Sequence, residues 1–195
     1  MTKAVWGARI RLAGVLILIV LTTSCGDMVR QGTGSSYLII RQLSGVAADG
    51  TTGNTLDSDV VTVINDVPTI LDDPGTVTFG LGMKDSSLTA TSANWITVDR
   101  YHVTFIRADG RNTPGVDVPY PFDGAFTVTV AGDAGGGFIW VRHQAKAEAP
   151  LLALARNGII ISTIAEITFY GHDQSGREVS ATGHMSVSFG NYGDK

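Results

Sequence analysis

Hydrophobic and polar residues alternate most regularly near the C-terminal end of the sequence. Ala165, Ile167 and Phe169 alternate with polar residues up to the segment 173–176 (DQSG), and alternation resumes over 178–189. A two-residue period of this length is typical of strands with one buried and one exposed face. The glycine in the intervening segment suits a tight turn, so we predict a β-hairpin here.

Shorter runs of the same kind, separated by turn residues, occupy the rest of the chain from Tyr37 onward. Strands are predicted over 37–43, 60–64, 76–84, 95–108, 126–130 and 138–141. Loops and turns rich in Gly, Pro and Asp are predicted over 45–57, 65–75, 85–94, 109–124 and 132–137. Closely spaced strands with almost no helix predict an all-β, antiparallel β-sandwich over 37–195.

Only the segment 146–158 (KAEAPLLALARNG) has helical character. Pro150 suits a first helical position, and Asn157-Gly158 would make a C-terminal cap. The sequence leaves two structures open for this segment, a short helix or an irregular crossover between sheets.

A different pattern occupies the first 25 residues. Basic residues precede an uninterrupted apolar run over 12–21, and small polar residues over 22–24 then lead to Cys25, the only cysteine of the chain. This order is typical of a secretory signal. The run is about half the roughly 20 residues that a membrane-spanning helix needs. The residues 22–24 (TTS) are also a poor site for ordinary signal peptidase, which prefers an A-x-A-like sequence.

The N-terminal segment resembles the signal of bacterial lipoproteins, whose lipobox ends in a small residue followed by a cysteine that becomes lipid-modified. The resemblance implies cleavage after Ser24 and acylation of Cys25. We therefore expect a lipoprotein signal peptide over 1–24, helical in its apolar part, and a lipidated flexible tether over 25–36.

The residue after the cysteine bears on the final location. Gly26, rather than Asp, resembles the arrangement in lipoproteins that leave the inner membrane of two-membrane bacteria. The expected location is therefore the bacterial cell envelope, with the lipid anchor in the outer membrane. For the remaining domain, the order of elements over roughly 37–189 resembles the Ig-like domains of secreted bacterial proteins. This resemblance is one of architecture, because the Cys…Trp…Cys core of true Ig domains is missing.

Charge narrows the range of partners. Without the three basic residues of the signal, 11 basic residues remain against 18 acidic ones, a formal charge of −7. An acidic domain argues against nucleic acid as a partner, since nucleic acids require a basic face. Membrane attachment would come from acyl chains rather than from charge.

No motif of an enzyme occurs in the chain: there is no G-x-S-x-G, H-E-x-x-H, C-x-x-C or P-loop pattern. The glycine cluster 132–137 precedes a predicted strand rather than a helix, so it does not predict a phosphate site. A non-catalytic protein is the leading interpretation. An envelope hydrolase using carboxylates drawn from Asp72, Asp73 and Asp123 is the weakest alternative.

Aspartates gather in the predicted loops. Carboxylates bunched at one end of a sandwich can bind calcium, and the candidate ligands are Asp72, Asp73, Asp109 and Asp123. The competing interpretation is that these are solvated turn residues, because Asp commonly caps turns. No cofactor other than calcium is indicated.

The proline-rich segment 107–124 carries Tyr120 and Phe122. A long loop without regular structure is often functional, and aromatic residues on a stiff loop can form a contact surface. The alternative is that both side chains fold back over an open edge of the sandwich.

Together these features predict a lipid-anchored binding or structural module whose partner is another envelope protein or a glycan. A calcium-dependent adhesion module is the second hypothesis, and the hydrolase is the third. The sequence does not indicate an oligomeric state.

Overall fold

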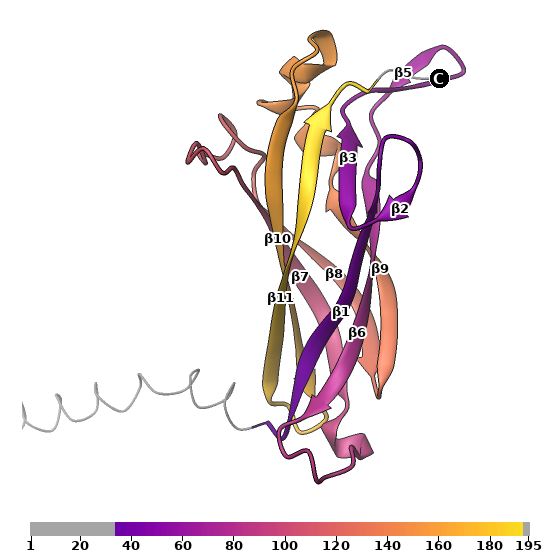
Figure 1. Cartoon of the computed structure of the whole chain (residues 1–195), viewed down its shortest axis with the longest axis vertical. Helices are drawn as coiled ribbons and strands as arrows, with labels where there is room; N and C mark the ends of the chain where they lie inside the picture. Colours follow the sequence, from indigo (N-terminus) through magenta and orange to yellow (C-terminus); the bar gives the residue numbers. More distant parts are fainter. Residues whose placement is uncertain (1–33, 193–195) are drawn as a thin grey trace, which may run out of the picture.

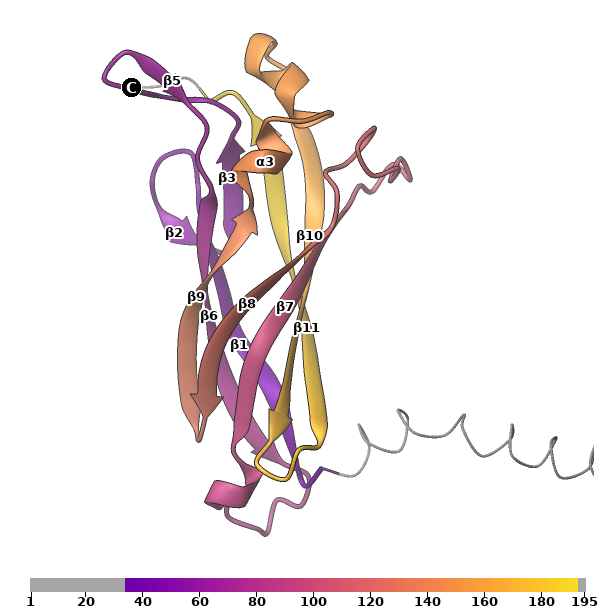
Figure 2. The ribbon, with the colours of Figure 1, turned by 180° about the vertical axis from the view of Figure 1, so that it is seen from behind.

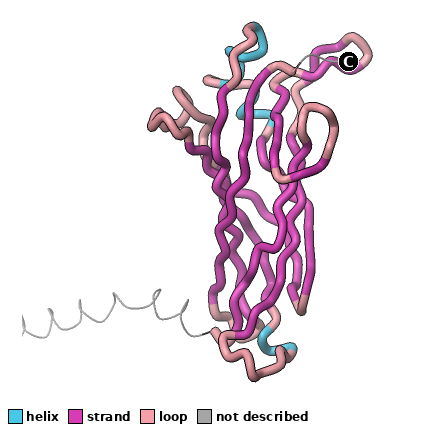
Figure 3. Tube along the Cα trace, viewed as in Figure 1, coloured by secondary structure: helices cyan, strands magenta, loops and turns pink. Residues whose placement is uncertain are grey.

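The computed structural model describes residues 34–192 of the 195-residue chain. The expected signal peptide, its cleavage after Ser24 and the lipidation of Cys25 lie outside the described residues. Most described residues belong to strands, and the helical segments are short (Figure 3). No helix within residues 34–192 is long and apolar enough to cross a membrane.

The strands form two packed sheets and a separate two-stranded ribbon (Figures 1 and 2). One sheet has the order β2-β1-β6-β9 and the other β3-β11-β10-β7-β8, while β4 and β5 form the ribbon. The strands are β1 (Ser36–Val46), β2 (Thr52–Gly53), β3 (Thr55–Asp59), β4 (Thr62–Ile64), β5 (Val67–Thr69), β6 (Asp73–Met83), β7 (Ile96–Ile106), β8 (Phe122–Val130), β9 (Asp133–Val141), β10 (Ile161–Asp173) and β11 (Glu178–Gly190). The prediction of an all-β sandwich is confirmed.

The C-terminal hairpin forms as predicted. β10 pairs with β11 from Ile161↔Phe189 to His172↔Glu178 without a register shift. Ala165, Ile167 and Phe169 are fully buried on the inner face. Gly176 in the turn has φ +78°, a conformation that a residue with a side chain rarely adopts.

Aromatic rings fill the space between the sheets. Phe169 lies edge-to-face against Phe79 of β6 and Phe138 of β9, with ring centroids 4.9 Å and 5.5 Å apart. Trp140 of β9 is fully buried, and its indole N–H donates to the carbonyl oxygen of Ser44 at 2.9 Å. Large rings bury the most apolar surface per residue, so this cluster supplies much of the hydrophobic stabilisation.

The predicted turn over 132–137 is wrong, because most of it belongs to strand β9. Gly135, Gly136 and Gly137 pair with β6. A Cβ at Gly135 would lie 2.7 Å from the carbonyl oxygen of Val77, and one at Gly136 would lie 2.9 Å from the ring of Phe126. The glycines therefore allow close approach within the sandwich rather than a turn.

The predicted loop over 45–57 is also partly wrong, since it contains β2 and most of β3. β3 runs parallel to β11, from Thr55↔Ser186 to Asp59↔Gly190, so the five-stranded sheet is mixed rather than purely antiparallel. Leu56 and Ser58 alternate as buried residues along it. A strand this short and polar gives little periodic signal.

A further correction concerns 65–75, predicted as a loop. It contains β5 and the first residues of β6. Asn65 and Asp66, between β4 and β5, have φ values of 51° and 63°. Two consecutive positive φ angles are typical of the type I′ turn of a tight hairpin.

The segment 146–158 is neither one helix nor fully irregular. The short helix α3 (His143–Lys146) ends at its start, and the 3-10 helix η2 (Leu151–Arg156) follows the cis peptide bond between Ala149 and Pro150. Pro150 and Asn157 flank η2 as its N-cap and C-cap. Leu151 and Leu154 are buried, so this segment covers part of the core.

The two ends of the domain differ. The chain enters at the end that also holds the β10–β11 turn and the 3-10 helix η1 (Ser92–Asn94) (Figure 1). The ribbon β4–β5, the segment 143–160 and the loop 107–121 lie toward the other end (Figures 1 and 2). We call these three segments, with the residues that join the ribbon to β6, the far end.

Candidate functional site

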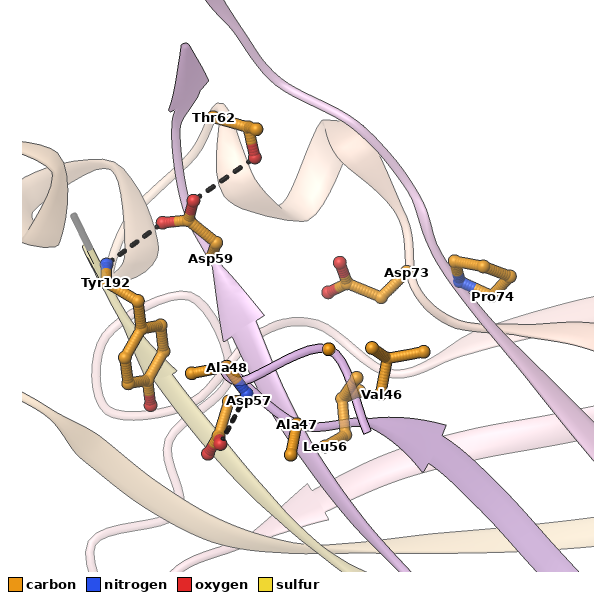
Figure 4. Close-up of a pocket in the computed structure, with 11 residues that line it drawn as sticks. Val46, Ala47, Ala48, Leu56, Asp57, Asp59, Thr62, Asp73, Pro74 and Tyr192 are labelled. Carbon is orange, nitrogen blue, oxygen red and sulfur yellow. Dashed lines mark hydrogen bonds between the residues drawn. The ribbon is translucent and has the colours of Figure 1, made fainter. Parts of the chain in front are cut away.

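A pocket of about 400 Å³ lies beside β3 and the first residues of β6 (Figure 4). It is lined by Val46, Ala47, Ala48, Gly50, Leu56, Asp57, Asp59, Thr62, Asp73, Pro74 and Tyr192. Three carboxylates contribute to its wall, those of Asp57, Asp59 and Asp73. Asp73 is one of the four candidate calcium ligands, whereas Asp57 and Asp59 reach the wall on β3, a strand that the sequence pattern does not predict.

The two aspartates of β3 bind neighbouring groups of the chain. Asp57 accepts a hydrogen bond from the backbone N–H of Ala48 at 2.9 Å. Asp59 accepts one from the backbone N–H of Tyr192 at 3.1 Å and one from the hydroxyl of Thr62 at 3.2 Å (Figure 4). These carboxylates tie loops to β3.

Asp73 takes part in a buried ion pair. Its carboxylate lies 2.6 Å from the ammonium of Lys146, which is 1% exposed, and accepts a hydrogen bond from the hydroxyl of Ser58 at 2.6 Å. The ammonium also donates to the carbonyl oxygen of Asp59 at 2.8 Å. Burial raises the pKa of Asp73, and it outweighs the lowering by the charge and hydrogen bond of Lys146 and by Ser58.

Tyr192 closes the pocket near the C-terminal end of the described chain. Its phenol donates to the carbonyl oxygen of Ser188 at 3.1 Å. Burial and the negative charge of Asp57 raise the pKa of Tyr192 to about 12. The phenol therefore stays protonated near neutral pH and does not suit a general base.

Asp72 turns to a different partner from its neighbour Asp73. It accepts hydrogen bonds from the backbone N–H of His143 at 2.6 Å and lies 2.9 Å from the imidazole Nδ1 of that residue. Burial alone would raise the pKa of Asp72, but the hydrogen bonds and charge of His143 together lower it. The two adjacent aspartates therefore bind different partners, His143 and Lys146.

The other two candidate calcium ligands also have partners of their own. Asp109 lies 2.6 Å from Nη2 of Arg107 and 3.1 Å from Nε of Arg111, and these hydrogen bonds hold its pKa well below the usual range. Asp123 lies 2.9 Å from Nδ1 of His102. Within residues 34–192, no group of three or more His, Cys, Asp or Glu side chains is arranged to hold a metal ion.

The two aromatic residues of the predicted contact loop separate. Phe122 is 5% exposed at the start of β8, beneath the guanidinium of Arg142 at 4.3 Å from the ring centroid. Phe122 is therefore a core residue of β8 and belongs neither to a contact surface nor to a loop folded over an edge. Tyr120 is 55% exposed, with its ring lying over Gly115, and Val116 nearby is 66% exposed.

Large apolar side chains are exposed on every segment of the far end. They are Val63, Ile64, Val67, Leu71, Val116, Tyr120, Leu152, Ile159 and Ile160. Of these residues only Tyr120 was predicted to be part of a contact surface. The pair Ile159-Ile160, directly after the polar Asn157-Gly158, could have indicated an apolar surface. The same two residues are equally compatible with the start of a buried strand.

Comparison with known proteins adds little to this geometry. No family model matches the chain, and no curated protein matches it. A solved structure described as an X-ray structure of the Northeast Structural Genomics Consortium target SoR45 is similar to it at 10% identity. The similarity covers 80% of this chain and 86% of the other, with a TM-score of 0.34.

Proposed function

We propose that this chain is a lipid-anchored, non-catalytic module of the bacterial cell envelope, whose Ig-like sandwich binds another envelope protein through its far end. The observation that carries the proposal is the concentration of exposed apolar side chains at the end opposite to the point where the chain enters the domain. The lipobox-like segment before Cys25 supplies the anchor.

The ribbon β4–β5 is the most distinctive part of this surface. It belongs to neither large sheet, and its residues Val63, Ile64 and Val67 are 41%, 43% and 59% exposed. A tight hairpin that exposes about half of the surface of its large apolar side chains contributes little to the core. Exposed apolar surface that is gathered in one region commonly marks an interaction site.

The position of the anchor gives this surface a direction. Strands such as β6, with 11 residues, span about 36 Å along the long axis of the sandwich. A lipid on Cys25 would hold the end where the chain enters the domain, which also holds the β10–β11 turn, near the membrane. The far end would then face away from the membrane and toward other envelope components.

The chemistry of the far end favours a protein over a glycan. Its exposed large side chains are aliphatic except for Tyr120. Aliphatic surface within a polar rim is characteristic of the core of protein interfaces. The satisfied carboxylates of Asp57, Asp59 and Asp73 support a non-catalytic role, since each already has a structural partner.

One experiment tests the anchor. Mass spectrometry of the protein isolated from its native membranes should find an acylated Cys25 at the N-terminus and no residues 1–24. An unmodified thiol or a retained signal would contradict the lipid anchor.

A second experiment tests the binding surface. A photo-crosslinking amino acid at Val67 should yield a discrete crosslinked partner in the native envelope. The matched control is Leu88, which is 56% exposed on the connection 84–95 at the other end of the domain. Equal crosslinking at both sites, or none at Val67, would contradict binding through the far end.

A further inference from the structure

On one long side of the sandwich, β1 and β11 have unpaired outer edges toward the end where the chain enters the domain. β3 pairs with β11 only over Ser186–Gly190, although β11 begins at Glu178. β2 pairs with β1 only at Gly45 and Val46. Within residues 34–192, no strand pairs with the outer edges of 36–44 or 178–185 (Figure 1). Each edge therefore presents backbone N–H and C=O groups to a further strand.

The inner face of β11 shows the effect of the missing strand. Val187 and Phe189, in the part that β3 flanks, are fully buried. Val179 and Ala181, in the part without β3, are only partly buried although they continue the same row. Met185, the next residue beyond β3, is also buried, so the core is half-open only around Val179 and Ala181.

β1 faces this open part with apolar side chains. Ile40 and Leu43 are partly buried against the core. Opposite them, Gly183 has no side chain, and a Cβ there would lie 2.7 Å from Leu43 Cδ1 and 3.1 Å from Ile40 Cδ1. A groove of about 350 Å³ remains between the two strands. It is lined by Ile40, Arg41, Gln42, Leu43, Asn54, Thr182, Gly183, His184 and Met185.

We propose that this groove binds an extended segment of a partner polypeptide, which adds as a strand to the edge of β11 in line with β3. An extended chain fits both features of the groove: its backbone can pair with the free edge, and its alternate side chains can cover the half-open apolar row. The existing ladder between β3 and β11 shows that this edge accepts a strand, and the free edge continues that ladder directly.

The shape of the site argues for a single segment rather than for a second copy of the domain. The free edge of β11 lies within a groove whose other wall is β1. A groove of about 350 Å³ has room for part of one extended chain and not for a sheet edge together with its flanking strands. The groove covers 182–185, the half of the unpaired length 178–185 that adjoins β3, so it fits a segment of about four residues with apolar side chains at alternate positions. The proposal does not depend on the lipid anchor or on the far end.

Selection of displayed random peptides against the detergent-solubilised full chain tests the proposal. We expect enriched sequences to alternate apolar and polar residues. Binding of a selected peptide should slow amide hydrogen exchange at least tenfold within 178–185. Gly183→Val, whose side chain would displace Leu43 and Ile40 in the wall of the groove, should weaken that binding at least tenfold. Gly53→Val should leave it unchanged, because no atom lies within 4 Å of a Cβ at Gly53.

Several results would overturn the proposal. They are the absence of any enriched peptide, binding that Gly183→Val does not weaken, and protection confined to other strands. Dimerisation that protects 178–185 without peptide would assign the groove to a second copy. If the amides of 178–185 are already protected in the free monomer, and deletion of residues 26–33 removes that protection, the groove binds this N-terminal segment of the same chain. The exchange measurement uses the wild-type protein, so it decides the matter even if Gly183→Val does not fold.

Discussion

Polar contacts hold one region of this domain, and apolar packing holds another. Around β3, α3 and the start of β6, the buried ammonium of Lys146 joins Asp73 and the carbonyl oxygen of Asp59, and Ser58 completes the cluster. In the sheet β7–β10–β11, regular ladders bury an alternating apolar face against aromatic rings. The first region depends on a few specific partners, whereas the second spreads its stability over many contacts.

The sharpest test of this difference is the loss of the buried cation. Lys146→Met should lower the free energy of unfolding by about 3–5 kcal/mol, because it leaves the Asp73 carboxylate buried without its counter-ion. Urea unfolding near neutral pH, followed by tryptophan fluorescence, measures the loss. Replacing both residues, as Lys146→Met with Asp73→Leu, should recover a large part of it.

The matched control for Lys146 is an exposed ion pair. Arg41 Nε lies 2.6 Å from Asp133, and the two side chains are 52% and 64% exposed. Arg41→Met should cost less than about 1 kcal/mol, because solvent screens such pairs. Equal losses for Arg41→Met and Lys146→Met would mean that burial does not distinguish the two pairs.

A glycine tests the packed region. A Cβ at Gly171 of β10 would lie 2.2 Å from the carbonyl oxygen of Thr97 and 2.8 Å from Cα of Val98, both backbone atoms of the paired strand β7. Gly171→Ala should destabilise the domain by about 1–3 kcal/mol, because the ladder must shift to admit the methyl group. Gly53→Ala, which meets no atom within 4 Å, should change stability by less than about 0.5 kcal/mol in the same urea titration.

Acid should affect the two regions in opposite directions. Burial alone would raise the pKa of Asp173, but hydrogen bonds from Ser175 and Arg177 together lower it. The stability that Asp173 contributes is present above its unfolded pKa, near 3.8, and is lost as the pH falls through its folded pKa. The raised pKa of Asp73 acts the other way. Its contribution is present below pH 3.8 and is lost as the pH rises through the folded value.

Two variants separate these contributions. The stability advantage of the wild type over Asp173→Asn should be about 1–3 kcal/mol near neutral pH and should shrink on acidification below about pH 4. Its advantage over Asp73→Asn should instead grow on acidification. Urea titrations at a series of pH values measure both differences, and changes of the same sign would contradict the opposite pKa shifts.

The same contrast explains which parts of the fold could be predicted from the sequence. The β10–β11 hairpin was predictable because Ala165, Ile167 and Phe169 repeat with the period of the strand. The first half of β9 was predicted as a turn because it contains Gly135, Gly136 and Gly137, and residues that permit close packing resemble turn residues. β3 was missed because its inward residues are one leucine and Ser58, whose burial depends on a partner 15 positions away.

The candidate sites follow the same rule. Nothing local relates Asp73 to Lys146, since they are 73 residues apart, and only the folded sandwich brings them together. The four candidate calcium ligands were grouped by residue type and loop position. In the structure Asp72, Asp73, Asp109 and Asp123 each contact a different cationic or imidazole side chain. Loop position alone does not determine which carboxylates converge.

Calcium gives the smallest expected effect. The pocket beside β3 is where carboxylates do gather, but Asp57, Asp59 and Asp73 already accept hydrogen bonds from the chain. We therefore expect about 5 mM calcium to shift the melting temperature by less than about 1 °C. A site occupied at 100 times its Kd would add about 2.7 kcal/mol, several degrees for a domain of this size.

Differential scanning calorimetry with calcium, with chelator and with sodium chloride of matched ionic strength makes this measurement. A shift of several degrees with calcium alone would require the carboxylates of the pocket to leave their present partners. Asp57→Asn should then abolish the shift, because it removes one of the three carboxylates of the pocket. Such a result would convert the polar region from a structural cluster into a ligand site and would restore the adhesion hypothesis.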